Sequence, residues 1–273
     1  MPDAAIDART TVNVIDRGEG VPVIVIPGVQ GRWEWHRPAI DALARFGRVL
    51  TFSLAGEPGS GVQCNQRSLI DCYCDQIATA MTDAGLARAS LCGISYGGLV
   101  AAVFAARYPE RVSSLILVSA LPPTWTPNRR VQTYLRLPRL CTPVFMLSSL
   151  RLATEIVSAS PHLADACATS VRHAWNVLTH FFSPVRMAGR ISDLATLNLT
   201  DEVRQVTAPT LVVIGESHLD LVVPVEATLD YVRLVPQAHV ATLAGTGHLG
   251  SITRPDAFAE LVASFAGQHS TPL

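Results

Sequence analysis

The sequence contains no lysine, and charged residues of both signs make up only 16% of its 273 residues. The 21 basic residues, all of them arginine, nearly balance 22 acidic ones and leave a net charge of −1. They form no basic cluster of the kind that follows a phosphate backbone. We therefore expect no nucleic-acid partner.

Long apolar runs are missing as well. No stretch approaches the roughly 18 apolar residues of a membrane-spanning helix. The N-terminal segment, MPDAAIDARTTVNV, lacks the positively charged region and following apolar region that mark a secretory signal. The sequence therefore predicts a cytoplasmic protein with no membrane partner.

Metal-binding spacings are also absent. None of the six cysteines forms a cysteine and histidine pattern typical of zinc sites. Cys72 and Cys74 lie in an expected helix, and Cys92 lies in an expected buried strand. We therefore expect the cysteines to be reduced packing residues and the protein to hold no metal.

What is present is a regular alternation of two kinds of segment. Short β-branched runs alternate with longer segments of helical period, which is typical of an α/β fold with a mostly parallel sheet and helices on both faces. The runs in VPVIVIPG and PTLVVIG are continuously apolar, as strands buried on both faces should be. The expected strands are Thr11 to Ile15, Val21 to Ile26, Val49 to Ser53, Ala89 to Cys92, Ser114 to Ser119, Thr210 to Ile214 and His239 to Leu243. The expected helices are Pro38 to Phe46, Gln66 to Ala84, Gly97 to Arg107, Val225 to Leu234 and Pro255 to Phe265.

One region breaks this alternation. Between Leu121 and about Asp193 there are prolines, arginines and bulky aromatic residues but no strand-like run. Ligands of open α/β sheets bind at the carboxyl ends of the strands, so an insertion that follows the strand ending at Ser119 would cover such a site. We expect a helical cap over residues 121–193 and a core made of residues 1–120 and 194–273.

The stretch LCGISYGGLVA places Ser95 between two glycines, after an expected strand and before an expected helix. A sharp reversal there would bring backbones so close that a Cβ at Gly93 or Gly97 would collide. Such a turn exposes a serine hydroxyl above the sheet. The Tyr96 N–H then lies at a helix N-terminus, where it can donate to an oxyanion.

A serine hydroxyl needs a general base to act as a nucleophile near neutral pH, and the base needs an orienting acid. Both are expected in loops after later strands, with the acid first. ESHLDLVVP follows PTLVVIG, and TGHLGSITRP follows HVATLAG. His248 is the candidate base. Asp220 is the candidate acid, with Glu216 in the same loop as the alternative.

With these three motifs in this order, the chain resembles the α/β-hydrolase family from about Thr11 to Phe265, excepting the cap. The resemblance implies that Ser95, Asp220 and His248 form a catalytic triad and that the Val29 and Tyr96 N–H groups form the oxyanion hole. The family usually has a histidine where this chain has Pro27, before Gly28. Gly28, Gln30 and Trp33 are candidate substrate-binding residues. Trp33 and Trp35 either line the acyl pocket or pack at the start of the next helix. Gln30 either contributes a side-chain amide or faces solvent.

A second departure from the family lies in SLAGEPGS, where Ser53 and Ala55 replace a charged pair that is structural in the family. Gly56 and Ser60 remain. We expect altered packing around this loop and no loss of chemistry.

These residues predict a serine hydrolase that cleaves a small to medium hydrophobic ester or lactone through an acyl-enzyme without a cofactor. Arg129, Arg130 and Arg136 are either solvated or close to an acidic group of the substrate. Four alternatives share the fold: carbon–carbon bond hydrolysis of a diketone, cofactor-free perhydrolysis with haloperoxidase activity, acyl transfer, and ligand binding without catalysis. The sequence does not indicate an oligomeric state.

Overall fold

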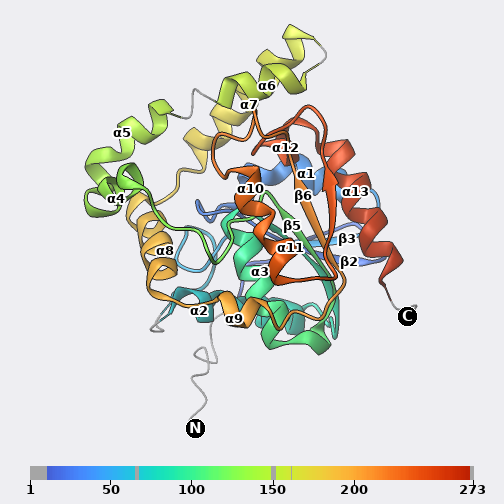
Figure 1. The fold of residues 1–273 in the computed structure, drawn as a ribbon. Coiled ribbons are helices and arrows are strands. Elements are labelled where there is room, and N and C mark those ends of the chain that lie inside the picture. Colours follow the sequence, from blue (N-terminus) through green and yellow to red (C-terminus); the bar gives the residue numbers. More distant parts are fainter. Residues whose placement is uncertain (1–10, 65–67, 149–151, 161, 271–273) are drawn as a thin grey trace.

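The computed structural model describes residues 11–64, 68–148, 152–160 and 162–270. Within them, seven strands form one sheet in the order β1-β3-β2-β4-β5-β6-β7 (Figure 1). β1 runs antiparallel to β3, and the other neighbouring strands are parallel, which confirms the predicted sheet. The strands are β1 (Ile15–Arg17), β2 (Pro22–Ile26), β3 (Arg48–Thr51), β4 (Ala89–Ile94), β5 (Val112–Val118), β6 (Thr210–Ile214) and β7 (His239–Thr242).

The first strand is the one whose position the sequence predicted wrongly. It was expected at Thr11 to Ile15, but it begins only at Ile15. The residues before it run beside a loop instead of a strand. The Asn13 N–H donates to Ser60 O at 3.1 Å, and its side-chain amide donates to Gly59 O at 3.0 Å.

Alternate side chains of the parallel strands enter two separate cores. Ile24 and Ile26 of β2 join the cluster formed with α2 and α3, whereas Val23 and Val25 join the cluster formed with α1 and α13. This two-sided burial is the reason that these strands read as continuous apolar runs. The covering helices are α1 (Arg37–Leu43), α2 (Leu69–Asp83), α3 (Tyr96–Arg107) and α13 (Pro255–Gln268).

Four of the five expected core helices are present with small shifts at their ends. The fifth, expected at Val225 to Leu234, is two short helices, α10 (Val225–Thr228) and α11 (Asp230–Leu234), interrupted at Leu229. The remaining short elements of the core are η1 (Trp33–His36), η2 (Pro109–Arg111), α9 (Thr200–Val203) and α12 (Gly250–Thr253).

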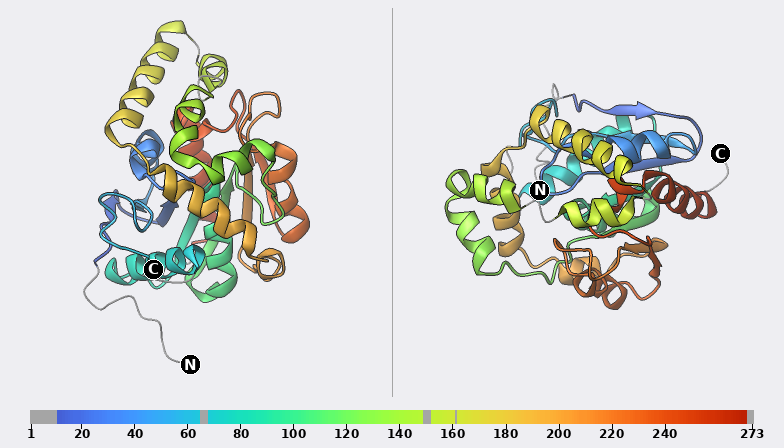
Figure 2. Two further views of the ribbon diagram at one scale, coloured as in Figure 1. Left: turned by 90° about the vertical axis from the view of Figure 1, so that its left-hand side faces the viewer. Right: turned by 90° about the horizontal axis from the view of Figure 1, so that it is seen from above.

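The segment between β5 and α9 is helical in its described parts. It contains α4 (Arg129–Arg136), α5 (Pro138–Ser148), α6 (Ala153–Ala159), α7 (Leu163–Thr179) and α8 (Pro184–Thr196). α4, α5 and α8 pack together, and α8 also contacts α2. α6 and α7 form a second group that contacts α12 and η1, on the side of the molecule where Figure 1 draws α12 (Figures 1 and 2). We call these five helices the helical insertion.

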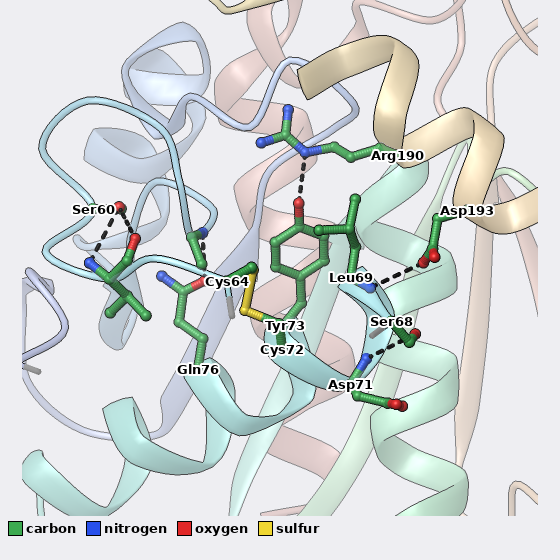
Figure 3. Close-up of a disulfide and its surroundings, with 12 residues drawn as sticks. Ser60, Cys64, Ser68, Leu69, Asp71, Cys72, Tyr73, Gln76, Arg190 and Asp193 are labelled. Atoms are coloured by element: carbon green, nitrogen blue, oxygen red, sulfur yellow. Dashed lines mark hydrogen bonds between the residues drawn. A yellow bond between two sulfur atoms is a disulfide. The ribbon is translucent and has the colours of Figure 1, made fainter. Parts of the chain in front are cut away.

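The expectation that all cysteines are reduced is wrong for one pair. Cys64 and Cys72 form a disulfide, with Cα atoms 5.8 Å apart (Figure 3). Cys72 lies in α2, whereas Cys64 lies in the loop before that helix. The spacing of cysteines within the helix therefore does not indicate this pair. Cys74 and Cys92 are free and buried, and burial raises the pKa of each thiol to about 12. These two are packing residues, as expected.

Candidate active site

Ser95 alone forms the turn between β4 and α3. β4 extends to Ile94 and α3 begins at Tyr96, so the reversal is shorter than the four residues that the sequence suggested. Ser95 has φ 55° and ψ −121°, and a positive φ is uncommon for any residue with a side chain. Its N–H donates to Val118 O at 2.9 Å, and its carbonyl accepts from the Gly98 N–H at 2.9 Å. Bonds to β5 and α3 thus hold the strained backbone.

The glycines around Ser95 stand where side chains would collide, which confirms the reason inferred for them. A Cβ at Gly93 would lie 2.3 Å from Gly97 O. A Cβ at Gly97 would lie 2.4 Å from Ile26 O at the end of the neighbouring strand. The turn can be this tight only because both positions lack a side chain.

Asp220 and His248 face each other from the loops that follow β6 and β7. His248 Nδ1 lies 3.3 Å from Asp220 Oδ1 and 3.4 Å from Oδ2. The N–H groups of Val222 and Val223 donate to Asp220 Oδ1 at 3.1 and 3.0 Å. Burial opposes ionisation of Asp220, but His248 and these N–H donors outweigh it and lower the pKa of the carboxyl group. Asp220 is therefore a carboxylate placed to orient an imidazole.

The alternative acid, Glu216, has a different contact. Its Oε1 accepts from the Gly245 N–H at 2.6 Å, at the start of the loop that carries His248. Its Oε2 lies 3.7 Å from His218 Nδ1 at the surface. The structure thus places Asp220, and not Glu216, beside His248.

Two glycines let the acid and base loops pass close to each other. A Cβ at Gly215 would lie 2.5 Å from Thr246 O, and a Cβ at Gly247 would lie 2.4 Å from Leu219 O. As a result, the side chains of Asp220 and His248 are brought together.

All three candidate triad residues belong to one edge of the sheet. Ser95 follows β4, Asp220 follows β6 and His248 follows β7, and these strands run parallel. Their carboxyl ends therefore meet at the same edge, where ligands of such sheets bind.

The loop after β2 lies against Ser95. A Cβ at Gly28 would lie 3.4 Å from Ser95 Cβ and 3.3 Å from Gln30 Oε1. The Gly31 N–H donates to Gly28 O at 2.8 Å and closes a tight turn that contains Val29. Gly28, a candidate substrate-binding residue, is thus a neighbour of Ser95, and the side chain of Gln30, a second candidate, lies against Gly28. On the other side of Ser95, the first N–H groups of α3 have no partner within the helix.

Arg190 is a residue of this region that sequence reasoning missed. It lies on α8 of the helical insertion and is fully buried. Its guanidinium donates to Val29 O at 2.8 Å, to the Tyr73 hydroxyl at 2.9 Å and to Glu57 Oε1 at 2.7 Å. Figure 3 shows Arg190 above the Tyr73 hydroxyl, and Tyr73 beside the disulfide. Burial opposes the charge on Arg190, but Tyr73 and Glu57 outweigh it and raise its pKa.

Two features of the neighbouring loops accommodate this buried ion pair. Gly31 has φ 73°, and a Cβ there would lie 2.7 Å from Arg190 Nη2, so the residue must be small. Glu57 is an acidic residue in the SLAGEPGS loop, where the altered packing was expected. A second buried pair lies after β2, where Arg32 Nη2 donates to Glu34 Oε1 at 2.7 Å, and Arg32 Nη1 donates to Pro58 O in the SLAGEPGS loop.

The two tryptophans after this loop, Trp33 and Trp35, contact different parts of the protein. Trp33 packs against the core on the α1 and α13 face, and the guanidinium carbon of Arg37 lies 5.2 Å from its ring centre. These contacts correspond to the packing alternative. Trp35 instead meets the helical insertion, where its Nε1 donates to His180 O at 3.0 Å and its ring lies 5.8 Å from that of Phe182.

His36 gives the site a measurable pH dependence of stability. Burial, with smaller contributions from His173 and His248, lowers the pKa of His36 to about 3. Between pH 6.5 and 3, His36 is protonated in the unfolded chain but neutral in the folded chain. The free energy of unfolding therefore falls as the pH falls. We expect the parent protein to lose about 1.5 kcal/mol more than His36→Gln between pH 6.5 and 5.0, as measured by urea unfolding. Equal losses in both proteins would contradict a neutral His36.

The described residues contain neither a metal-binding group nor a membrane-spanning helix. In residues 11–64, 68–148, 152–160 and 162–270 there is no group of three or more histidine, cysteine or acidic side chains arranged to hold a metal ion. Over the same ranges, no helix has the length and apolar character needed to cross a membrane.

The site can be compared with known proteins. The sequence profile of the alpha/beta hydrolase fold matches residues 21–255. A protein of Azorhizobium caulinodans with the provisional name carbamate hydrolase RutD is 27% identical over 259 residues, which cover 92% of this chain and 93% of that protein. The 2-hydroxymuconate semialdehyde hydrolase of Pseudomonas putida is 26% identical over 272 residues, or 94% of this chain and 90% of that protein.

Solved structures agree on the fold. An esterase from Exiguobacterium antarcticum superposes with a TM-score of 0.77 at 20% sequence identity, over 93% of this chain and 94% of that one. The fold that the motifs around Ser95, Asp220 and His248 indicated is thereby confirmed.

Proposed function

The chain belongs to the alpha/beta hydrolase family and is a hydrolase, and we propose that it cleaves a carboxylic ester or lactone through an acyl-enzyme on Ser95. One observation carries this proposal. A buried carboxylate, Asp220, contacts His248 at the edge of the sheet where the strained turn holds Ser95. Nucleophilic acyl transfer needs an oriented imidazole and a serine held on such a turn, and both are supplied at this edge of the sheet.

The proposed chemistry proceeds in two halves. His248 Nε2 takes the proton of the Ser95 hydroxyl as its oxygen attacks the substrate carbonyl, and Asp220 stabilises the resulting imidazolium. The N–H groups of Val29 and Tyr96 donate to the oxyanion. The bond to the leaving oxygen then breaks, and that oxygen receives the proton from His248. In the second half, His248 deprotonates a water molecule that attacks the acyl carbon, the bond from that carbon to Ser95 Oγ breaks, and Ser95 Oγ receives the proton from His248 as the acid leaves.

We further propose that residues 121–193 act as a cap over this site, with the core formed by residues 1–120 and 194–273. Support comes from insertion residues that reach core loops beside the triad. Arg190 bonds the Val29 loop, and Trp35 contacts Phe182. Aromatic and aliphatic side chains at this junction favour a small to medium hydrophobic substrate. Arg129, Arg130 and Arg136 are exposed on α4, as solvated residues would be.

A second candidate is carbon–carbon bond hydrolysis, since the relative from Pseudomonas putida is named for a semialdehyde hydrolase. The same triad would serve it. A panel separates the two reactions: p-nitrophenyl esters of increasing chain length, a lactone, a phenyl carbamate and a vinylogous diketone. We assign ester or lactone hydrolysis if these substrates give the larger kcat/KM, and carbon–carbon hydrolysis if the diketone does.

The nucleophile is tested directly with a fluorophosphonate probe followed by peptide mass mapping. We expect covalent labelling at Ser95 in the parent protein, because an activated serine attacks the phosphorus centre. Labelling should fall at least about a hundredfold in His248→Ala, which lacks the general base. An unlabelled parent protein, or equal labelling of His248→Ala, would contradict the proposed mechanism.

A further inference from the structure

Glu155 of the helical insertion contacts the loop that carries the proposed base. It lies on α6, with its side chain fully buried. Its Oε1 accepts from the Gly247 N–H at 2.7 Å and from the Leu249 N–H at 2.6 Å. These are the residues immediately before and after His248, so one carboxyl oxygen binds the backbone on both sides of the imidazole.

This contact is a strong restraint on the loop. Two backbone N–H groups share one buried acceptor oxygen at 2.7 and 2.6 Å, which are short distances for N–H···O bonds. Ile156, the next residue of α6, packs in one apolar cluster with Leu249 and Ile252. The helix therefore binds the loop through both a polar and an apolar contact.

We propose that Glu155 is a positioning residue for His248. By holding the N–H groups of Gly247 and Leu249, it sets the direction of the imidazole toward Ser95, and so the insertion helps to assemble the triad as well as to enclose the substrate. This role rests on the proposed serine mechanism.

The second carboxyl oxygen of Glu155 makes a conservative substitution possible. Glu155 Oε2 is among the described buried atoms without a hydrogen-bond partner. Burial raises the pKa of Glu155 to about 7, against the opposing effects of the two N–H donors and of His248, while Asp220 adds to the rise. A neutral side chain with one accepting oxygen is therefore tolerated at this position. Glutamine keeps that oxygen, whereas leucine keeps the approximate volume without an acceptor.

The test compares Glu155→Leu and Glu155→Gln with Val157→Ala, a change on the exposed side of the same helix. We expect Glu155→Leu to lower kcat about 10- to 100-fold with a change in KM below about 3-fold, because small misplacements of a catalytic group have effects of this size. The rate of fluorophosphonate labelling at Ser95 should fall by a similar factor. Glu155→Gln should stay within about 3-fold of the parent protein, and Val157→Ala should match it.

Hydrogen exchange supplies a readout that needs no catalysis. Peptides covering residues 244–252 should exchange faster in Glu155→Leu than in the parent protein or in Glu155→Gln, because the two N–H groups lose their acceptor. If the parent protein is not labelled at Ser95, the proposed hydrolysis is overturned. Hydrogen exchange then tests only the contact between Glu155 and the loop that carries His248. Glu155→Ala repeats every measurement if the leucine variant does not fold.

Two results would overturn the role of Glu155. One is parent-like kcat, labelling and exchange in Glu155→Leu or Glu155→Ala. The other is a glutamine variant as impaired as the leucine variant, since it retains the accepting oxygen and should rescue the position of His248.

Discussion

Replacing Ser95 by alanine is expected to lower kcat for ester hydrolysis by about 10⁴- to 10⁶-fold. The change removes the proposed nucleophile and leaves Asp220, His248 and the proposed oxyanion donors in place, so only the catalysis that those groups give to direct attack by water remains. Steady-state kinetics on the best p-nitrophenyl ester measures the effect.

Ser119 provides a matched control for this substitution. It is a buried serine with φ 41° directly after β5, the strand next to β4. Ser119→Ala should keep kcat within about 3-fold of the parent value, because Ser119 has no role in the proposed chemistry. Comparable losses in both variants would show that the effect of Ser95→Ala is structural and would remove its support for a nucleophile.

Replacing Arg190 by methionine is expected to lower the free energy of unfolding by about 3–5 kcal/mol. Arg190 and Glu57 are both fully buried side chains joined at 2.7 Å. Removal of the cation leaves the Glu57 carboxylate buried without its partner, which is the costly outcome for a buried ion pair. Urea unfolding monitored by circular dichroism measures the loss.

Two further variants isolate the cause. Arg186→Met lies on the exposed side of the same helix and should change stability by less than about 0.5 kcal/mol. Arg190→Met combined with Glu57→Leu should recover most of the loss, because no buried charge is then left unpaired. A double variant no more stable than Arg190→Met would mean that packing of the guanidinium, and not its charge, dominates.

The parts of the site that could be predicted from the sequence are those set by local geometry. Gly93 and Gly97 are required by close approaches within a few residues of Ser95, so the motif reveals the turn. Asp220 and His248 follow directly after apolar strands, whose parallel arrangement places their loops at one edge. Asp220 and Glu216 lie in the same loop, and the choice between them as the acid depends only on which side chain contacts His248.

The residues that sequence reasoning missed depend on contacts between distant segments. Glu155 bonds Gly247, which lies 92 residues away, and Arg190 bonds Glu57, which lies 133 residues away. The insertion has no strand pattern that would place its helices, so neither partner could be assigned in advance. The Cys64–Cys72 disulfide was not predicted, because Cys64 lies outside α2, the helix that contains Cys72.

The two buried contacts made by the helical insertion limit how the enzyme can be engineered or diversified. α6 supplies Glu155 to the histidine loop and α8 supplies Arg190 to the loop after β2. A graft of the insertion from a relative, made to alter substrate range, would have to bring matching partners for both or leave buried charges and unpaired N–H groups in the host. The proposed cap is thus more readily altered by substitution within the insertion than by exchange of the whole segment.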